Sequence, residues 1–218
     1  MKLLLTSTGI VNPSLTKAFF DLVGKKPEDT SLVYIPTAAM SEPGDKSWVI
    51  EDLVHIKNLG LKQIEIADIS ALPKEVWKPR FESADALFFE GGNIYYLMHW
   101  IQQSGLAELL PELLKTKVWV GVSAGSMVLS PTLDLKVSQE LYVEDLDQTA
   151  DGHALNFVNF YVLPHLNSQY FKKLTLENIE EVIKNSTYKQ YALDDESGIK
   201  VDGDSIEIIS EGEWKGWN

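Results

Sequence analysis

Hydrophobic positions along the chain follow two patterns that alternate with each other. Short runs rich in apolar and β-branched residues cover residues 2–8, 31–36, 62–67, 84–89 and 118–122, and each predicts a β-strand. Between them, stretches with apolar residues every three or four positions predict helices at residues 13–23, 46–59, 94–103 and 106–114. Strands that alternate with helices predict an α/β fold with a mostly parallel sheet and helices on both faces.

The pattern changes in the last third of the chain. Residues 157–163 and 190–193 are strand-like, and residues 168–185 are expected to be helical. Residues 198–201 and 205–209 flank Asp202-Gly203-Asp204, which predicts a C-terminal β-hairpin with an Asp-Gly turn. No repeat or linker interrupts the sequence, so we expect residues 1–218 to form a single domain.

Composition narrows the range of partners. The net charge is −13, from 19 basic and 32 acidic residues, and such a surface repels phosphate backbones, so no nucleic-acid partner is expected. No apolar run approaches the length of about 18 residues that a membrane helix needs, so no membrane partner is expected. The N-terminal apolar run is too short for a signal peptide, which favours a cytoplasmic protein. The chain has no cysteine, so a nucleophile would have to be a hydroxyl, an amine or a carboxylate.

A candidate nucleophile follows the fifth predicted strand. Gly121-Val122-Ser123-Ala124-Gly125 has the G-x-S-x-G spacing of a sharp strand-to-helix turn that exposes a serine hydroxyl. The N–H of Ala124 would then be available to a developing oxyanion. A strand–helix turn in which small residues only permit close packing is the alternative interpretation.

A second glycine-rich turn follows the fourth predicted strand. In a parallel sheet, Gly91-Gly92-Asn93 would lie at the same edge as Ser123, because both segments follow the carboxyl ends of strands. Gly92 could supply a second oxyanion donor, and Asn93 could cap the next helix. A tight turn with a helix cap and no catalytic role explains this motif equally well.

A serine nucleophile needs a base, and the chain has four histidines. His55 and His99 lie within predicted helices, where an ordinary structural role is expected. His165 follows a predicted strand and is the first candidate, with His153 second.

An acid must orient the base, and two regions offer one. Asp194-Asp195-Glu196 follows a strand-like segment and contains three candidates, any of which could simply belong to a solvated turn. The order serine, histidine, acid differs from that of the α/β-hydrolases, in which the acid comes second. Asp134 and Asp151 keep that other order open.

Taken together, these segments resemble the family of serine peptidases that contains aspartyl dipeptidase (dipeptidase E) and cyanophycinase. The resemblance covers nearly the whole chain and rests on Ile35-Pro36-Thr37-Ala38, Gly91-Gly92-Asn93, Gly121-Val122-Ser123-Ala124-Gly125-Ser126, Pro164-His165 and Leu193-Asp194-Asp195-Glu196-Ser197-Gly198. It implies a fold like that of the class I glutamine amidotransferases, which is flavodoxin-like. It also implies Ser123 as nucleophile, His165 as base, Gly92 and Ala124 as oxyanion donors, and Asp195 as the acid, with Glu196 the next candidate.

One departure from the family pattern concerns the substrate. Aspartyl dipeptidases typically carry, after the histidine, an arginine that pairs with the substrate's aspartyl carboxylate. Residues 166–173 contain Lys172 and Lys173 but no arginine, and an ammonium cannot reproduce the two-pronged guanidinium contact. Specificity for an N-terminal aspartate is therefore less strongly implied than peptide hydrolysis.

The expected function is that of a serine exopeptidase that hydrolyses dipeptides or short peptides, without a metal or cofactor. An isopeptide hydrolase of the cyanophycinase type, an esterase, or a non-catalytic binding module on the same fold are the alternatives. Trp214 and Trp217, or a helix face, could form an interface, so a homodimer is left open.

Overall fold

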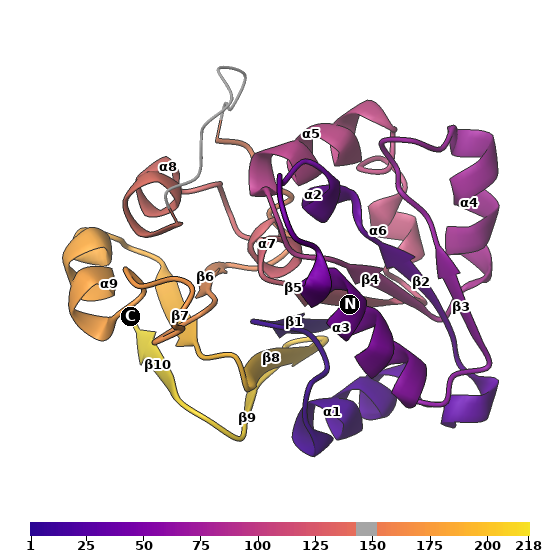
Figure 1. Cartoon of the computed structure of the whole chain (residues 1–218), viewed down its shortest axis with the longest axis horizontal. Helices are drawn as coiled ribbons and strands as arrows, with labels where there is room; N and C mark the ends of the chain where they lie inside the picture. The colour runs from indigo at the N-terminus through magenta and orange to yellow at the C-terminus, as the bar shows by residue number, and fades with distance from the viewer. Residues whose placement is uncertain (143–151) are drawn as a thin grey trace.

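The computed structural model describes residues 1–142 and 152–218 and contains a large mixed sheet at its centre (Figure 1). The strands of this sheet are β1 (Lys2–Thr6), β2 (Ser31–Ile35), β3 (Gln63–Ile66), β4 (Ala86–Phe89), β5 (Val118–Val122), β8 (Ser197–Asp202) and β9 (Ser205–Ser210). Their order is β3-β2-β4-β5-β1-β8-β9. The pairs from β3 to β1 are all parallel, whereas β8 and β9 are antiparallel. The predicted α/β class with a mostly parallel sheet is confirmed.

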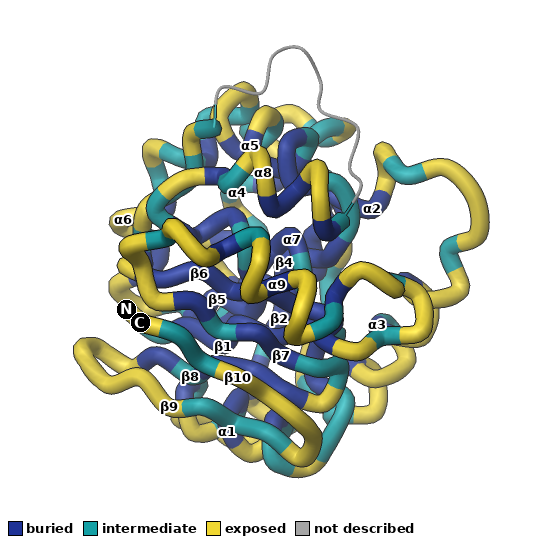
Figure 2. The backbone as a smooth tube through the Cα atoms, turned by 90° about the vertical axis from the view of Figure 1, so that its left-hand side faces the viewer, coloured by how far each residue is buried: buried dark blue, intermediate teal, exposed yellow. Residues whose placement is uncertain are grey.

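Helices cover both faces of this sheet. Helices α1 (Pro13–Val23) and α3 (Ser47–Asn58) pack on one face, and α4 (Lys74–Ser83), α5 (Ile94–Gln103), α6 (Leu110–Leu113) and α7 (Ala124–Met127) pack on the other. The short helix α2 (Thr37–Met40) follows β2 and contacts α5. Alternate residues of β1 serve the two faces: Leu4 belongs to one core, and Leu3 and Leu5 belong to the other. Figure 2 shows the central strands β1, β4 and β5 as largely buried, whereas the edge strand β9 is exposed or intermediate.

A smaller sheet lies beside the first. It contains β6 (Phe160–Leu163), β7 (Lys189–Leu193) and β10 (Trp214–Trp217), in the order β10-β7-β6, with β6 and β7 parallel. Phe160 and Val162 of β6 join the core of the main sheet, whereas Leu163 faces a third apolar cluster with α9 (Leu176–Ile183) and α8 (Leu135–Val137). This sheet, with the helices beside it, forms the left side of the view in Figure 1.

Several local predictions are confirmed at the residue level. Asn93 caps α5, as predicted, by accepting the Tyr96 N–H at 2.9 Å. Asn12 caps α1 in the same way by accepting the Leu15 N–H at 2.9 Å. The predicted hairpin is formed by β8 and β9, whose closing pair is Asp202 with Ser205.

Other predictions are wrong in extent. The helix expected over residues 168–185 begins only at Leu176, because Thr175 caps it and residues 168–174 form turns instead. Of the helix expected over residues 106–114, only Leu110–Leu113 is α-helical, with a proline in its first turn. The segments at residues 157–163 and 190–193 are strands, as predicted, but they belong to the smaller sheet. Helices α2 and α4 and strand β10 were not predicted.

The described part of the chain contains no helix with the length and hydropathy to cross a bilayer.

Candidate active site

The two sheets bring the ends of four strands to one place. Ser7 and Ser123 each follow directly after a strand of the main sheet, β1 and β5, which are paired neighbours. His165 and Asp195 each lie two residues beyond a strand of the smaller sheet, β6 and β7, which are also paired. All four residues therefore lie at the carboxyl ends of strands, where α/β sheets usually place their sites. Because the strands of each pair are parallel, the two residues of each pair lie at the same edge of their sheet.

Ser123 occupies a sharp and strained turn between β5 and α7. Its φ and ψ of 47° and −109° lie outside the regions that side-chain-bearing residues favour. The flanking glycines are required by close approach: a Cβ on Gly121 would lie 2.4 Å from the Gly125 carbonyl oxygen, and one on Gly125 would lie 2.2 Å from the Phe89 carbonyl oxygen. The predicted strand–turn–helix is therefore present, although its helix is only four residues long. Because the helix is so short, its contribution to binding an oxyanion is assigned to hydrogen bonds from its free N–H groups rather than to a helix dipole.

The structure brings together three of the predicted residues. His165 Nε2 lies 3.0 Å from Ser123 Oγ, and His165 Nδ1 lies 2.8 Å from Asp195 Oδ1. The bond to a carboxylate favours the tautomer with the proton on Nδ1, which leaves Nε2 free to accept the serine proton. The order along this line is that of a nucleophile, a base and an orienting acid.

Ser7 is a member of this arrangement that was not predicted. Its hydroxyl donates to Asp195 Oδ1 at 2.9 Å and accepts the backbone N–H of His165 at 2.8 Å. The next residue, Thr8, donates its hydroxyl to the Asp195 carbonyl oxygen at 2.6 Å. A serine and a threonine after a strand carry no distinctive sequence signal; only their place beside Ser123 in a parallel sheet could have suggested them.

The environment of Asp195 favours its ionised form. Partial burial acts to raise the pKa of this carboxyl, but hydrogen bonds from His165, Ser7 and Ser168 and the charge of the imidazole outweigh burial and hold the pKa below its usual range. The carboxylate is therefore available to stabilise a positively charged His165.

The backbone N–H groups of Gly92 and Ala124 lie near Ser123 and have no partner among the described residues. The turn that contains Gly92 packs against the elbow, since a Cβ on Gly91 would lie 3.2 Å from Ser123 Cβ. Gly92 itself has φ of +126°, and a Cβ there would overlap the Ala38 carbonyl group at 2.4 Å, so only glycine fits.

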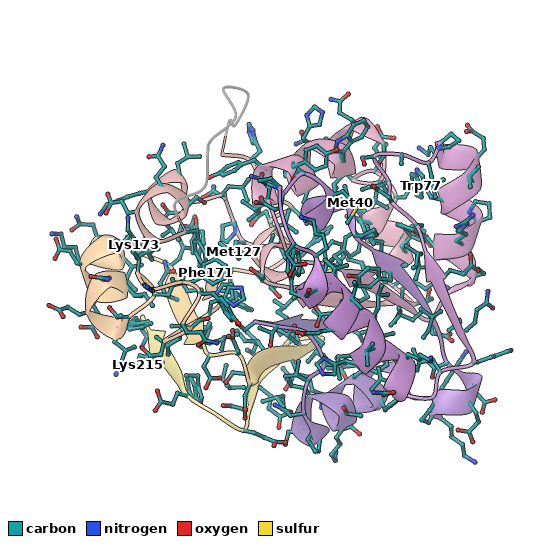
Figure 3. All side chains as sticks on the ribbon, viewed as in Figure 1. Met40, Trp77, Met127, Phe171, Lys173 and Lys215 are labelled. Carbon is teal, nitrogen blue, oxygen red and sulfur yellow. The ribbon has the colours of Figure 1, made fainter. Side chains whose placement is uncertain are left out.

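Phe171 covers one face of His165. Its ring, labelled in Figure 3, stacks on the His165 imidazole with centroids 4.3 Å apart and planes within 9°. The segment that carries it is part of the turn region where a helix was expected.

The other candidate residues lie in different surroundings. His153 pairs with Thr132 in an isolated bridge, and Asp134 caps α8. Asp194 accepts the hydroxyl of Ser197 at 2.5 Å within the turn that precedes β8. Asp151 and most of the acidic stretch that contains it lie outside the described residues.

The side chains of the remaining candidates are not part of the line from Ser123 to Asp195. His55 and His99 lie on α3 and α5, as predicted. Glu196 accepts a hydrogen bond from the side chain of Asn12 through its backbone carbonyl oxygen, at 2.9 Å. Within residues 1–142 and 152–218, no three His, Asp or Glu side chains gather in a way that could hold a metal ion.

The sequence as a whole matches one protein family. The model of peptidase family S51 aligns with residues 3–209 of this chain. The chain belongs to peptidase family S51. It is therefore a peptidase of the serine type, and the resemblance inferred from its motifs is confirmed.

Individual relatives of this S51 chain are distant. An uncharacterized peptidase of Listeria innocua is 28% identical over 187 residues, which cover 80% of this chain and 85% of that protein. An uncharacterized peptidase of Pasteurella multocida is 29% identical over 154 residues, covering 67% of this chain and 70% of that one. A peptidase E of Shewanella oneidensis is 30% identical over 112 residues, which cover 50% and 44% of the two chains.

Solved structures share the fold of this S51 member over its whole length. A crystal structure assigned as a peptidase E of Listeria monocytogenes superposes with a TM-score of 0.77 at 22% identity, covering 97% of this chain and 98% of that one. A peptidase from an acI-B1 actinobacterium superposes with a TM-score of 0.69 at 20% identity, covering 98% of this chain and 88% of that chain. At these identities the superpositions establish the fold alone.

Proposed function

We propose that this S51 peptidase is an exopeptidase that hydrolyses dipeptides or short peptides through an acyl-enzyme on Ser123. The observation that carries the proposal is the line from Ser123 Oγ to His165 Nε2 at 3.0 Å and from His165 Nδ1 to Asp195 at 2.8 Å. Short peptides are the proposed substrates because the motifs of the chain resemble those of the aspartyl dipeptidases, and one matched relative is named peptidase E.

In the first half of the reaction, Ser123 Oγ attacks the peptide carbonyl carbon while His165 Nε2 takes the hydroxyl proton. The negative charge on the carbonyl oxygen is held by the N–H groups of Gly92 and Ala124. The C–N bond then breaks, and His165 gives its proton to the departing amine. Asp195 stabilises the imidazolium throughout and keeps its orientation.

In the second half, water attacks the ester carbonyl carbon of the acyl-enzyme and gives a proton to His165. The C–O bond to Ser123 breaks, the serine oxygen regains the proton, and the carboxylic acid leaves. Ser123, His165 and Asp195 are thereby returned to their starting protonation states.

The preference for the substrate's N-terminal residue follows from charge. The chain has one arginine, Arg80, and its guanidinium is occupied at the edge of the main sheet, 3.0 Å from the Ile66 carbonyl oxygen and 3.4 Å from Glu65. An aspartyl substrate could therefore meet only a lysine near the site, which gives a weaker and less directional contact. We propose that Asp-X dipeptides are accepted but not strongly preferred.

The test is hydrolysis of a panel of X-Leu and Asp-X dipeptides by the wild type and by Ser123→Ala. Ser130→Ala is the control serine variant, because the Ser130 hydroxyl is buried and has no partner among the described residues. The proposal requires cleavage that is lost in Ser123→Ala and kept in Ser130→Ala. Cleavage of an isopeptide or ester probe alone would reassign the substrate, and cleavage of no probe would favour a binding module.

A further inference from the structure

A pair of buried carboxyl groups lies directly behind the turn that contains Gly92. Glu90 is fully buried at the end of β4, and Asp52 of α3 is nearly so. The Asp52 carboxyl is a close neighbour of Glu90, and the Tyr34 hydroxyl of β2 donates to Glu90 Oε2. Nothing in the proposed reaction uses these groups. Burying two carboxyl groups together costs free energy unless both are hydrogen-bonded.

Each member of the pair contacts a different loop of the active site. Glu90 Oε1 accepts the backbone N–H of Gly91 at 2.7 Å, and Gly91 packs against Ser123. Asp52 lies against Gly9, where a Cβ would meet its Oδ1 at 3.3 Å. Gly9 belongs to the loop whose Ser7 and Thr8 hold Asp195. The acid pair thus joins the oxyanion turn to the loop that supports the acid of the triad.

The bond from Gly91 fixes the peptide that precedes the proposed oxyanion donor. Glu90 N–H donates to the Ile35 carbonyl at 3.0 Å, and Asn93 N–H donates to the Ala38 carbonyl at 3.1 Å. With the N–H groups of residues 90, 91 and 93 all bonded, the Gly92 N–H is the one left over in the turn. We propose that Glu90, held by Asp52 and Tyr34, is a positioning residue that orients the Gly92 N–H for the oxyanion; this rests on the proposed function.

The arrangement depends on a proton within the pair. Burial, followed by the charge of Glu90, raises the pKa of Asp52, and burial raises the pKa of Glu90 despite its hydrogen bonds to Tyr34, Gly91 and Asp52. On α3, Glu51 adds negative charge, and His55 Nδ1 lies 3.9 Å from Asp52 Oδ1. With one proton the carboxyls bond to each other; when both are ionised at alkaline pH they repel, and Glu90 loses its fixed place beside Gly91.

The first experiment follows hydrolysis of p-nitrophenyl acetate, which needs no knowledge of side-chain preference. Glu90→Met keeps the bulk but cannot accept the Gly91 N–H, and it should lower kcat by about tenfold to a hundredfold with little change in KM. Glu90→Gln retains an acceptor oxygen and should keep most of the kcat near neutral pH. Asp52→Asn should remove the alkaline decline in kcat. Trp77→Phe is the control for loss of stability. Trp77 lies on α4, is buried in the core and is labelled at the right of Figure 3, and its variant should keep the wild-type kcat.

A second measurement does not depend on activity. In the wild type the Gly91 amide proton should resonate downfield, exchange slowly with solvent and titrate at alkaline pH, as expected for a bond to a carboxylate. In Glu90→Met all three properties should be lost.

The outcomes separate this proposal from the proposed function. Wild-type kcat in Glu90→Met, or an unchanged Gly91 amide, would overturn the positioning role and leave the function standing. Loss of peptide cleavage in every assay, with the Gly91 amide behaving as expected, would overturn the function and leave the role of Glu90 in fixing the turn.

Discussion

Removal of the Ser7 hydroxyl is expected to weaken both the fold and the catalysis. This fully buried group ties Asp195 to the backbone of His165: it donates to the carboxylate at 2.9 Å and accepts the His165 N–H at 2.8 Å. In Ser7→Ala the buried N–H is left without a partner, at a cost of about 1–3 kcal/mol. The lost bond to Asp195 costs about 0.5–1 kcal/mol more, because that side chain is 40% exposed and water can replace the hydroxyl.

The expected loss in free energy of unfolding is therefore about 1.5–4 kcal/mol. Urea titration measures this loss. An m-value equal to that of the wild type would show that the variant exposes the same surface on unfolding. The value of kcat/KM should also fall by about tenfold to a hundredfold, because the imidazole and its acid are no longer held in register.

Ser130→Ala is the matched control for Ser7→Ala. The Ser130 hydroxyl is as buried as that of Ser7 but has no partner in the described part of the chain. Its removal should lower the free energy of unfolding by less than about 0.5 kcal/mol, or raise it. Equal losses of stability in the two variants would refute the reasoning, since the hydrogen bonds of Ser7 would then contribute nothing.

Three further results are expected. Ser123→Ala should lower turnover by about a thousandfold or more without loss of thermal stability, as measured by single-turnover kinetics and by calorimetry. Gly125→Ala should destabilise the fold by more than about 3 kcal/mol, because its Cβ would lie 2.2 Å from the Phe89 carbonyl oxygen; a melting temperature equal to that of the wild type would contradict the elbow geometry. Asp195 has a lowered pKa, so its contribution to stability should be present above its unfolded pKa of about 4 and lost as pH falls through the lower folded value. Asp195→Asn should flatten that part of the stability curve in acid, and an unchanged slope would show that the carboxylate is not stabilised.

The sequence could predict those features that depend on local rules. The elbow around Ser123 was predictable because two glycines at fixed offsets and a preceding apolar strand are required by the turn itself. The position of His165 was predictable in the same way, since it follows the end of a strand. Of the three acids at residues 194–196, the pattern alone could not select Asp195, because the choice depends on which side chain faces across to the other sheet.

Features that depend on pairing between distant segments were missed. Strands β6, β7 and β10 are four or five residues long, and nothing in their periodicity shows that they form a separate sheet. Helix α4 contains Pro79 and has few apolar residues, so its pattern is weak. The start of α9 was misplaced because Tyr170, Phe171 and Leu174 recur at intervals of three and four residues, which is helix spacing, whereas in the fold Phe171 stacks on His165.

The division of the site between two sheets has a consequence for how this peptidase fails. The proposed nucleophile Ser123 and the proposed oxyanion turn lie on the main sheet, whereas His165 and Asp195, the proposed base and its acid, lie on the smaller one. The smaller sheet has three short strands, and a unit of this kind can open at a lower free energy than the large core beside it. Such a sub-global opening separates His165 from Ser123 while the elbow remains intact. Activity therefore depends on contact between the two sheets. Mild heat or a low concentration of denaturant is expected to abolish activity before the main sheet unfolds.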